Sequence, residues 1–178
     1  MIIKHKGKHL ADSLATPNDI YLKCMNINGF YKATLDVCAT SKNSKCDFYI
    51  QKREDALKVD WNFANSCMKD ILYKLNVSRQ ILSKPVCFCN PPHSKSKLFV
   101  EQAYNQWRKN NLDIVMLLPV NVLGSEYSKK FILPFIKYKP EMFLGRIRFL
   151  DPITNKPSKY NSVNSYFTYA YYDDRNED

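Results

Sequence analysis

Glycine, acidic residues and long apolar runs are all scarce in this chain. Only 4 of its 178 residues are glycine and 25% are charged, a composition that excludes a disordered polypeptide. The longest apolar run, Ile114 to Leu118, is far shorter than the roughly 20 residues that span a bilayer. Residues 1–6 lack the apolar region of a signal peptide. We therefore expect a soluble, intracellular and cytoplasmic protein with no membrane partner.

Metal-binding and disulfide patterns are also missing. The six cysteines include no Cys-x-x-Cys pair, and His5, His9 and His93 do not fall into a zinc-site spacing. These observations predict no metal site and buried, reduced thiols in a reducing compartment.

Negative charge is in short supply. The chain has 17 Asp and Glu against 27 Lys and Arg, a formal net charge of +10. This balance favours a polyanionic partner such as DNA or RNA. The alternative is an ordinary solvated surface in a lysine-rich proteome.

The hydrophobic pattern predicts alternating helices and strands. Residues 1–15 are expected to form an arm, and Thr16-Pro17 to start a helix that ends near Asn28. Strands are expected at 33–38, 86–89, 113–118, 143–150 and 165–172. Helices are expected at 63–75, from Ser94 through Trp107, and at 126–133, whereas residues 40–60 are irregular.

This order predicts one α/β domain over residues 16–172, followed by an acidic tail at 173–178. The sheet is mostly parallel, with helices on both faces and an antiparallel C-terminal edge. In such sheets ligands bind beyond the carboxyl ends of strands, where Asp36, Asn90 and Pro119 lie.

The tetrapeptide Asn90-Pro91-Pro92-His93 directly follows the apolar strand Val86 to Cys89. Many amino-group methyltransferases hold their target nitrogen with Asn-Pro-Pro and a flat ring, usually Tyr, Phe or Trp. The Asn oxygen and the first proline carbonyl accept hydrogen bonds from the amine, and consecutive prolines hold that carbonyl still. The ring stacks on the base, a role open to histidine. The alternative is a tight turn with His93 on the surface.

Several short blocks accompany this turn in one order along the chain. They are Ala15-Thr16-Pro17, Thr34 to Thr40, Asn43 to Cys46, Glu54 to Leu57 with Trp61, Phe88 to Pro92, Leu117 to Pro119, Arg146 to Phe149, and Asn164-Ser165. Over roughly residues 12–170 the chain resembles the phage-type Dam family of DNA adenine-N6 methyltransferases.

The resemblance implies a Rossmann-like methyltransferase fold, S-adenosylmethionine as cofactor, adenine in DNA as substrate and a virus- or phage-encoded protein. Thr16 and Pro17 would lie beside the methionine end of the cofactor, Asp36 would face it, and Asp55 would bind its adenosine part. Asn90 would border the cofactor and, with Pro91, Pro92 and His93, hold the base.

Each implied role has a simpler alternative. Thr16-Pro17 could only cap a helix, Asp36 could be an ordinary acid at a strand end, and Asp55 could cap a helix. Basic side chains that could contact phosphates, or simply be solvated, are Lys95, Lys97, Lys129, Lys130, Arg146 and Arg148.

Three features depart from the family pattern: His93 in place of the usual aromatic ring, a helical insertion at 62–84, and a small chain without a separate target-recognition domain, so that specificity is expected from loops such as 120–130 and 151–163 or from a partner. Asp36 also replaces the usual glycine-rich turn. The insertion could bind a second copy or another partner chain. The leading hypothesis is a site-specific DNA adenine-N6 methyltransferase, in which His93→Tyr keeps or raises activity. Alternatives are a catalytically weak or inactive methyltransferase-like protein that binds nucleic acid or a partner, and an enzyme acting on RNA.

Overall fold

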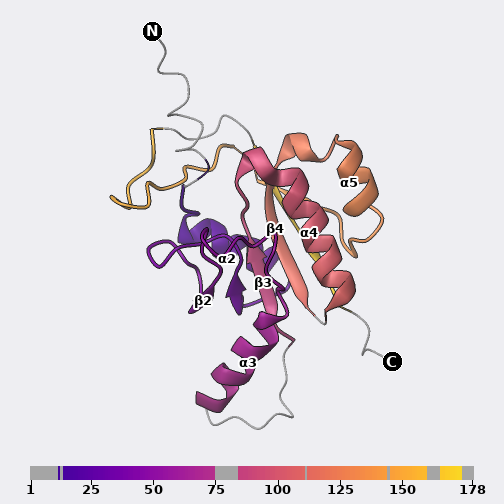
Figure 1. The fold of residues 1–178 in the computed structure, drawn as a ribbon. Helices are drawn as coiled ribbons and strands as arrows, with labels where there is room; N and C mark the ends of the chain where they lie inside the picture. Colours follow the sequence, from indigo (N-terminus) through magenta and orange to yellow (C-terminus); the bar gives the residue numbers. More distant parts are fainter. Residues whose placement is uncertain are drawn as a thin grey trace.

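A six-stranded mixed sheet forms the centre of the computed structural model, which describes residues 12, 14–74, 84–110, 112–143, 145–159 and 165–173 (Figure 1). The strand order is β2-β1-β3-β4-β6-β5. Four strands are parallel: β1 (Leu35–Asp36), β2 (Phe48–Tyr49), β3 (Val86–Cys89) and β4 (Asp113–Pro119). Antiparallel β6 (Tyr166–Tyr171) and β5 (Glu141–Met142) complete one side of the sheet. The predicted α/β class and antiparallel C-terminal part are confirmed.

The connection order reverses between β1 and β3. The chain passes from β1 outward to β2 and then returns to place β3 on the other side of β1. In open α/β sheets such a reversal leaves a crevice beyond the carboxyl ends of the two central strands. Asp36 ends β1 and Asn90 follows β3, so both residues border this crevice.

Apolar layers cover both faces of the sheet. Alternate residues of β4 point to opposite sides: Ile114, Met116 and Leu118 pack with α4 (Ser96–Lys109) and α5 (Glu126–Phe131). Val115 and Leu117 pack with α2 (Asn18–Ile27) and the segment 143–149. All seven residues of β4 are buried, as expected for a strand covered on both faces.

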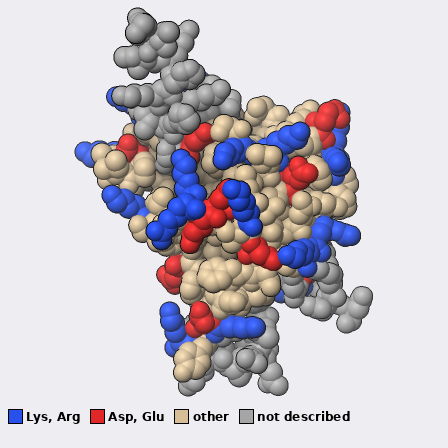
Figure 2. Space-filling model, in the orientation of Figure 1, with Lys and Arg blue, Asp and Glu red and all other residues tan. Residues whose placement is uncertain are grey.

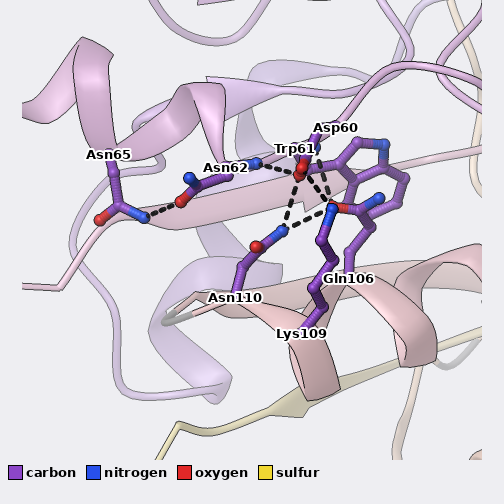
Figure 3. A network of polar contacts seen from close by, with 7 residues as sticks. All are labelled: Asp60, Trp61, Asn62, Asn65, Gln106, Lys109 and Asn110. Carbon is purple, nitrogen blue, oxygen red and sulfur yellow. Dashed lines mark hydrogen bonds and ion pairs between the residues drawn. The ribbon is translucent and has the colours of Figure 1, made fainter.

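The helix α3 (Phe63–Lys74) projects from the body of the molecule (Figure 1). Its first turn is held by a polar network between the preceding loop and the end of α4 (Figure 3). The backbone N–H of Trp61 donates to Gln106 Oε1 at 2.9 Å, and Asn110 donates to both Gln106 and Asp60. Lys109 pairs with Asp60 at 2.6 Å. The helix predicted at 63–75 is present as α3 as far as residue 74, and residues 75–83 lie outside the described residues.

Two strand predictions differ from the structure. Residues 143–150 were expected to form a strand, but in the described part of this range Leu150 makes isolated bridges to Ala15 and Pro157, and the Phe143 N–H donates to the Tyr166 carbonyl. The apolar spacing that suggested a strand has another cause. Phe143, Ile147 and Phe149 are buried in the apolar cluster that also contains residues of α2. Residues 40–60, expected to be irregular, contain β2.

Residues near both ends of the expected domain make backbone hydrogen bonds that the sequence did not predict. Ala15 exchanges backbone hydrogen bonds with Leu150, so the last residue of the expected arm belongs to the domain. Asp173, expected in the acidic tail, is buried, and its N–H donates to Asp113 Oδ1. Residues 1–11, 13 and 174–178 lie outside the described residues. No helix in the described ranges has the length and apolar character needed to cross a bilayer.

Candidate functional site

The side chain of Asn90 is fixed at the carboxyl end of β3. Its Nδ2 donates a hydrogen bond of 2.8 Å to the hydroxyl oxygen of Thr16. This contact commits one end of the amide, so the other end, Oδ1, points away from Thr16. Oδ1 is buried and has no hydrogen-bond partner among the described residues. A buried acceptor without a partner costs about 1–3 kcal/mol, and such groups usually mark a ligand or functional site.

Thr16 serves the site and does not cap the helix. The N-terminal cap of α2 is Pro17, and no side chain makes a capping hydrogen bond there. Thr16 is buried, and its hydroxyl meets Asn90 instead. The helix-cap alternative for Thr16 is therefore wrong, and Pro17, expected at the first helical position, is instead the cap that precedes the first helical residue, Asn18.

The two prolines carry the chain from β3 into a short 3-10 helix, His93–Lys95, which continues into α4. Pro91 is buried and Pro92 is half-buried. Because both rings restrict φ to about −65°, the Pro91 carbonyl is held in place beside Asn90.

His93 is half-buried against the rings of Tyr166 and Phe149. Its Nε2 is 2.8 Å from the Tyr166 hydroxyl, and its ring centroid is 6.3 Å from that of Phe149. Burial lowers the pKa of His93 below its ordinary value of 6.5, while the negative charge of Asp12 partly opposes this shift. The imidazole is therefore mainly neutral at pH 7.

Asn90, Pro91, Pro92 and His93 line one small hollow together with Asp12, Leu14 and Phe149. Its volume is about 20 Å³, enough for roughly one water molecule and far below what an adenine needs. Asp12 is one of the lining residues and accepts a 2.6 Å hydrogen bond from the Ser94 hydroxyl. A base can enter only after the residues around the hollow move apart.

Asp36 lies on the neighbouring strand at the same edge of the sheet. The adjacency is direct, since Cys38 Sγ and Cys89 Sγ are 3.7 Å apart. The Asp36 carboxylate accepts backbone N–H bonds from Cys38 and Lys45, which order the loop after β1. Burial raises the pKa of Asp36 to about 6, although these two hydrogen bonds oppose the shift. Asp36 is thus a buried carboxylate that is only partly protonated near neutral pH.

Asp55 adopts a positive φ of 57° in the turn that follows β2. Its Oδ1 accepts an N–H bond from Leu57, and its carboxylate pairs with Lys58 at 3.4 Å. These contacts are local, and they cap a turn rather than the helix that the sequence suggested. The described contacts do not join Asp55 to Asn90 or Asp36.

The six predicted phosphate-binding side chains occupy different settings. Lys95 and Lys97 are exposed just beyond His93, and Arg146 and Arg148 are exposed on the segment that carries Phe149. Lys129 pairs with Glu126, and Lys130 lies over the Phe131 ring. Figure 2 shows basic and acidic side chains interspersed on one face of the molecule.

A larger hollow of about 580 Å³ lies at the opposite end of the central strands, beside the start of β4. It is lined by the end of α2, by Lys84 and Lys137, and by Tyr138 and Tyr172. None of the predicted site residues lines it. The hollow around Asn90 remains the better candidate because it combines the strand-order reversal with a buried acceptor without a partner.

Three residues of the site carried no recognisable signal in the sequence: Asp12, Phe149 and Tyr166. Phe149 stood in a matching block, but no pattern linked it to the base, and Tyr166 is one of several tyrosines in its strand. Within the described residues, no three His, Cys, Asp or Glu side chains cluster as a metal site requires.

Comparisons with known proteins assign the chain to a family. Among curated proteins, none matches the chain. The family model described as DNA N-6-adenine-methyltransferase (Dam) matches residues 4–169, a span that includes every residue of the site. Since the match covers nearly the whole sequence, this chain belongs to the DNA N-6-adenine-methyltransferase (Dam) family.

Proposed function

We propose that this protein is a site-specific methyltransferase that uses S-adenosylmethionine to methylate the N6 amino group of adenine in DNA. One observation carries the proposal: Asn90 Oδ1 is buried, unpaired among the described residues and adjacent to Pro91. An amide oxygen held in this way suits an amine that enters from outside. The crevice at the strand-order reversal supports a Rossmann-like methyltransferase arrangement.

Asn90 and Pro91 would activate the nitrogen. The N6 amine of adenine is a poor nucleophile because its lone pair is delocalised into the ring. Oδ1 of Asn90 and the Pro91 carbonyl each accept one N6–H, which favours a tetrahedral nitrogen with a free lone pair. Pro92 restrains the turn, and His93 stacks on the base. In duplex DNA the base is first flipped out, at a cost of a few kcal/mol.

The cofactor supplies a methyl group on a sulfonium: the N–C bond forms as the S–C bond breaks, and N6 releases one proton. The cationic sulfonium suits a site beside the buried Asp36 carboxylate. Because both Asp36 oxygens accept backbone N–H bonds, Asp36 would act through its charge and through the loop that it orders. Thr16, Pro17 and Asn90 would border the methionine end, and Asp55 would meet the adenosine part.

Lys95, Lys97, Arg146 and Arg148 would contact DNA phosphates, because these exposed cations flank the segments that form the hollow. Lys129 and Lys130 are weaker candidates, since Glu126 and the Phe131 ring already engage them. The projecting helix α3 would be the contact for a second copy or another partner chain. An intracellular, cytoplasmic and virus- or phage-encoded protein would be consistent with this function.

A second function is favoured by the size of the hollow. At about 20 Å³ it holds no base, and His93 offers less stacking surface than tyrosine. These features would suit a methyltransferase-like protein that binds nucleic acid or a partner with little or no turnover.

Methyl transfer from labelled cofactor separates the candidates. The protein is incubated with mixed-sequence DNA or RNA, and the product is tested for N6-methyladenine. We expect the modified base in DNA; a product in RNA alone would move the activity to that substrate. Thermal stabilisation by the cofactor without any product would support the non-catalytic function. At 100 times its dissociation constant a ligand adds about 2.7 kcal/mol to stability, so absence of stabilisation would refute cofactor binding.

A further inference from the structure

We propose that Tyr166 is a positioning residue that works through His93: its hydroxyl donates a hydrogen bond to Nε2 and holds the imidazole in the orientation needed to stack on the base. The inference rests on the proposed function, because it explains how a histidine performs the task of the family's larger aromatic ring.

The contact joins distant parts of the chain. Nε2 of His93 and the Tyr166 hydroxyl are 2.8 Å apart, although the two residues are separated by 73 positions. Tyr166 begins β6 and is fully buried, so its ring cannot leave the contact without disturbing the sheet.

A third ring completes the arrangement. Phe149 meets Tyr166 edge to face at 5.0 Å and His93 at 6.3 Å. Edge-to-face contacts of this kind restrict the rotation of each ring. The three side chains therefore form one aromatic cluster, in which Tyr166 of β6 and Phe149 contact the ring of His93.

The direction of the hydrogen bond depends on which nitrogen of the neutral imidazole carries the proton. A neutral imidazole has one unprotonated nitrogen, and the proposal places it at Nε2, where it accepts from the phenol. Burial favours the neutral form, whereas Asp12, which faces His93 from the N-terminal segment, favours the cation. We therefore assign the proton to Nδ1 and the acceptor role to Nε2.

Two variants from the same strand give a matched test. Tyr166→Phe removes the hydroxyl that meets His93. Tyr171→Phe removes a buried hydroxyl that donates to the Phe131 carbonyl on the other face of the sheet. Each variant removes a hydroxyl that makes a hydrogen bond, part-buried at Tyr166 and buried at Tyr171, and only the first touches the site. We expect similar losses of thermal stability, but a fall in kcat/KM of about tenfold for Tyr166→Phe alone.

Nitrogen-15 NMR of the histidine side chains provides a readout that does not need turnover. His93→Gln assigns the His93 signals. We expect wild-type His93 to be the Nδ1–H form, and we expect Tyr166→Phe to raise the pKa of His93 because a bond to the neutral form is lost. The pH profile of kcat/KM should shift in the same direction.

The outcomes are distinct. If Tyr166→Phe lowers kcat/KM no more than Tyr171→Phe, or if His93 carries its proton on Nε2, the positioning role is refuted. If the wild-type protein transfers no methyl group, the proposed function fails, and NMR still decides whether Tyr166 holds the ring. If Tyr166→Phe does not fold, the test rests on the His93 tautomer in the wild-type protein: a proton on Nδ1 supports the positioning role, and a proton on Nε2 refutes it.

Discussion

The Asn90 amide donates a hydrogen bond of 2.8 Å to the Thr16 hydroxyl oxygen, and its own buried oxygen has no hydrogen-bond partner among the described residues, in a side chain that lines the hollow beside Pro91. The bond links the start of the helix α2 to the carboxyl end of β3. The two ends of the Asn90 amide therefore have different roles. Nδ2 fixes the side chain to Thr16, and Oδ1 is available to accept a hydrogen bond from a ligand.

Asn90→Ala should lower kcat for methyl transfer by at least about 100-fold, since a preorganised hydrogen-bonding group at a reacting centre contributes on this scale. The fold should persist, because the variant removes one side-chain hydrogen bond. Asn65→Ala is the control, since Asn65 is half-buried at the start of α3, away from the site, and its side chain bonds to Asn62 in its described contacts. Rates are measured under saturating cofactor and DNA. Near wild-type turnover in Asn90→Ala would refute its catalytic role.

Thr16→Val should reduce kcat by about tenfold, because valine keeps the shape but leaves the Asn90 amide free to rotate. Thr16→Ser retains the hydroxyl and should recover most of the activity. This pair separates the hydrogen bond from the packing of the side chain. If Thr16→Ser is as poor as Thr16→Val while both melt like the wild type, the methyl group of Thr16 matters more than its hydroxyl.

His93→Tyr should lower activity, although the sequence alone suggested that it would keep or raise it. Tyrosine is longer than histidine, and His93 Nε2 already lies 2.8 Å from the Tyr166 hydroxyl, so a phenol at position 93 would meet the Tyr166 phenol. We expect a loss of about tenfold or more from such overpacking. Tyr166→Leu should make room and restore part of the rate in the double variant.

A double-mutant cycle of kcat/KM and melting temperature measures this coupling. Additive effects of His93→Tyr and Tyr166→Leu would contradict a steric conflict. Full activity of His93→Tyr alone would mean that the new ring takes a different direction.

Sequence patterns predicted the helices and the central strands well, because the spacing of apolar residues directly reflects burial on one face or both. They failed at 143–150, where Phe143, Ile147 and Phe149 alternate with exposed residues while packing on α2 without pairing as a strand. Thr16 and Asn90 were singled out, but their hydrogen bond was not, since it joins segments that only the folded sheet brings together. The contact between Tyr166 and His93 was not predicted for the same reason.

Cofactor affinity should fall as the pH drops through about 6, the pKa to which burial raises Asp36. Protonation removes the negative charge that favours a sulfonium, so binding is strongest when Asp36 is ionised above this pH. The sign for stability is opposite: between pH 4 and 6 the native state holds more protons than the unfolded chain, so this group stabilises the fold as the pH falls.

Calorimetric titration of the cofactor from pH 5 to 8 measures the first effect, with Asp36→Asn as the control that carries no charge. The variant should bind more weakly and with a flatter pH dependence. Equal wild-type affinity at pH 5 and pH 8 would contradict an electrostatic role of Asp36.

Gln106→Leu should destabilise the protein by about 1–3 kcal/mol without changing kcat. Leucine fills the same space, but the buried N–H of Trp61 loses the oxygen that accepts it at 2.9 Å, and Asn110 loses one of its acceptors (Figure 3). Asn105→Leu, on the exposed side of α4, is the control and should stay within about 0.5 kcal/mol of the wild type. Urea unfolding measures both. A loss of methyl transfer with an unchanged free energy of unfolding would mean that the base of α3 is coupled to the active site, and not only to the stability of the fold.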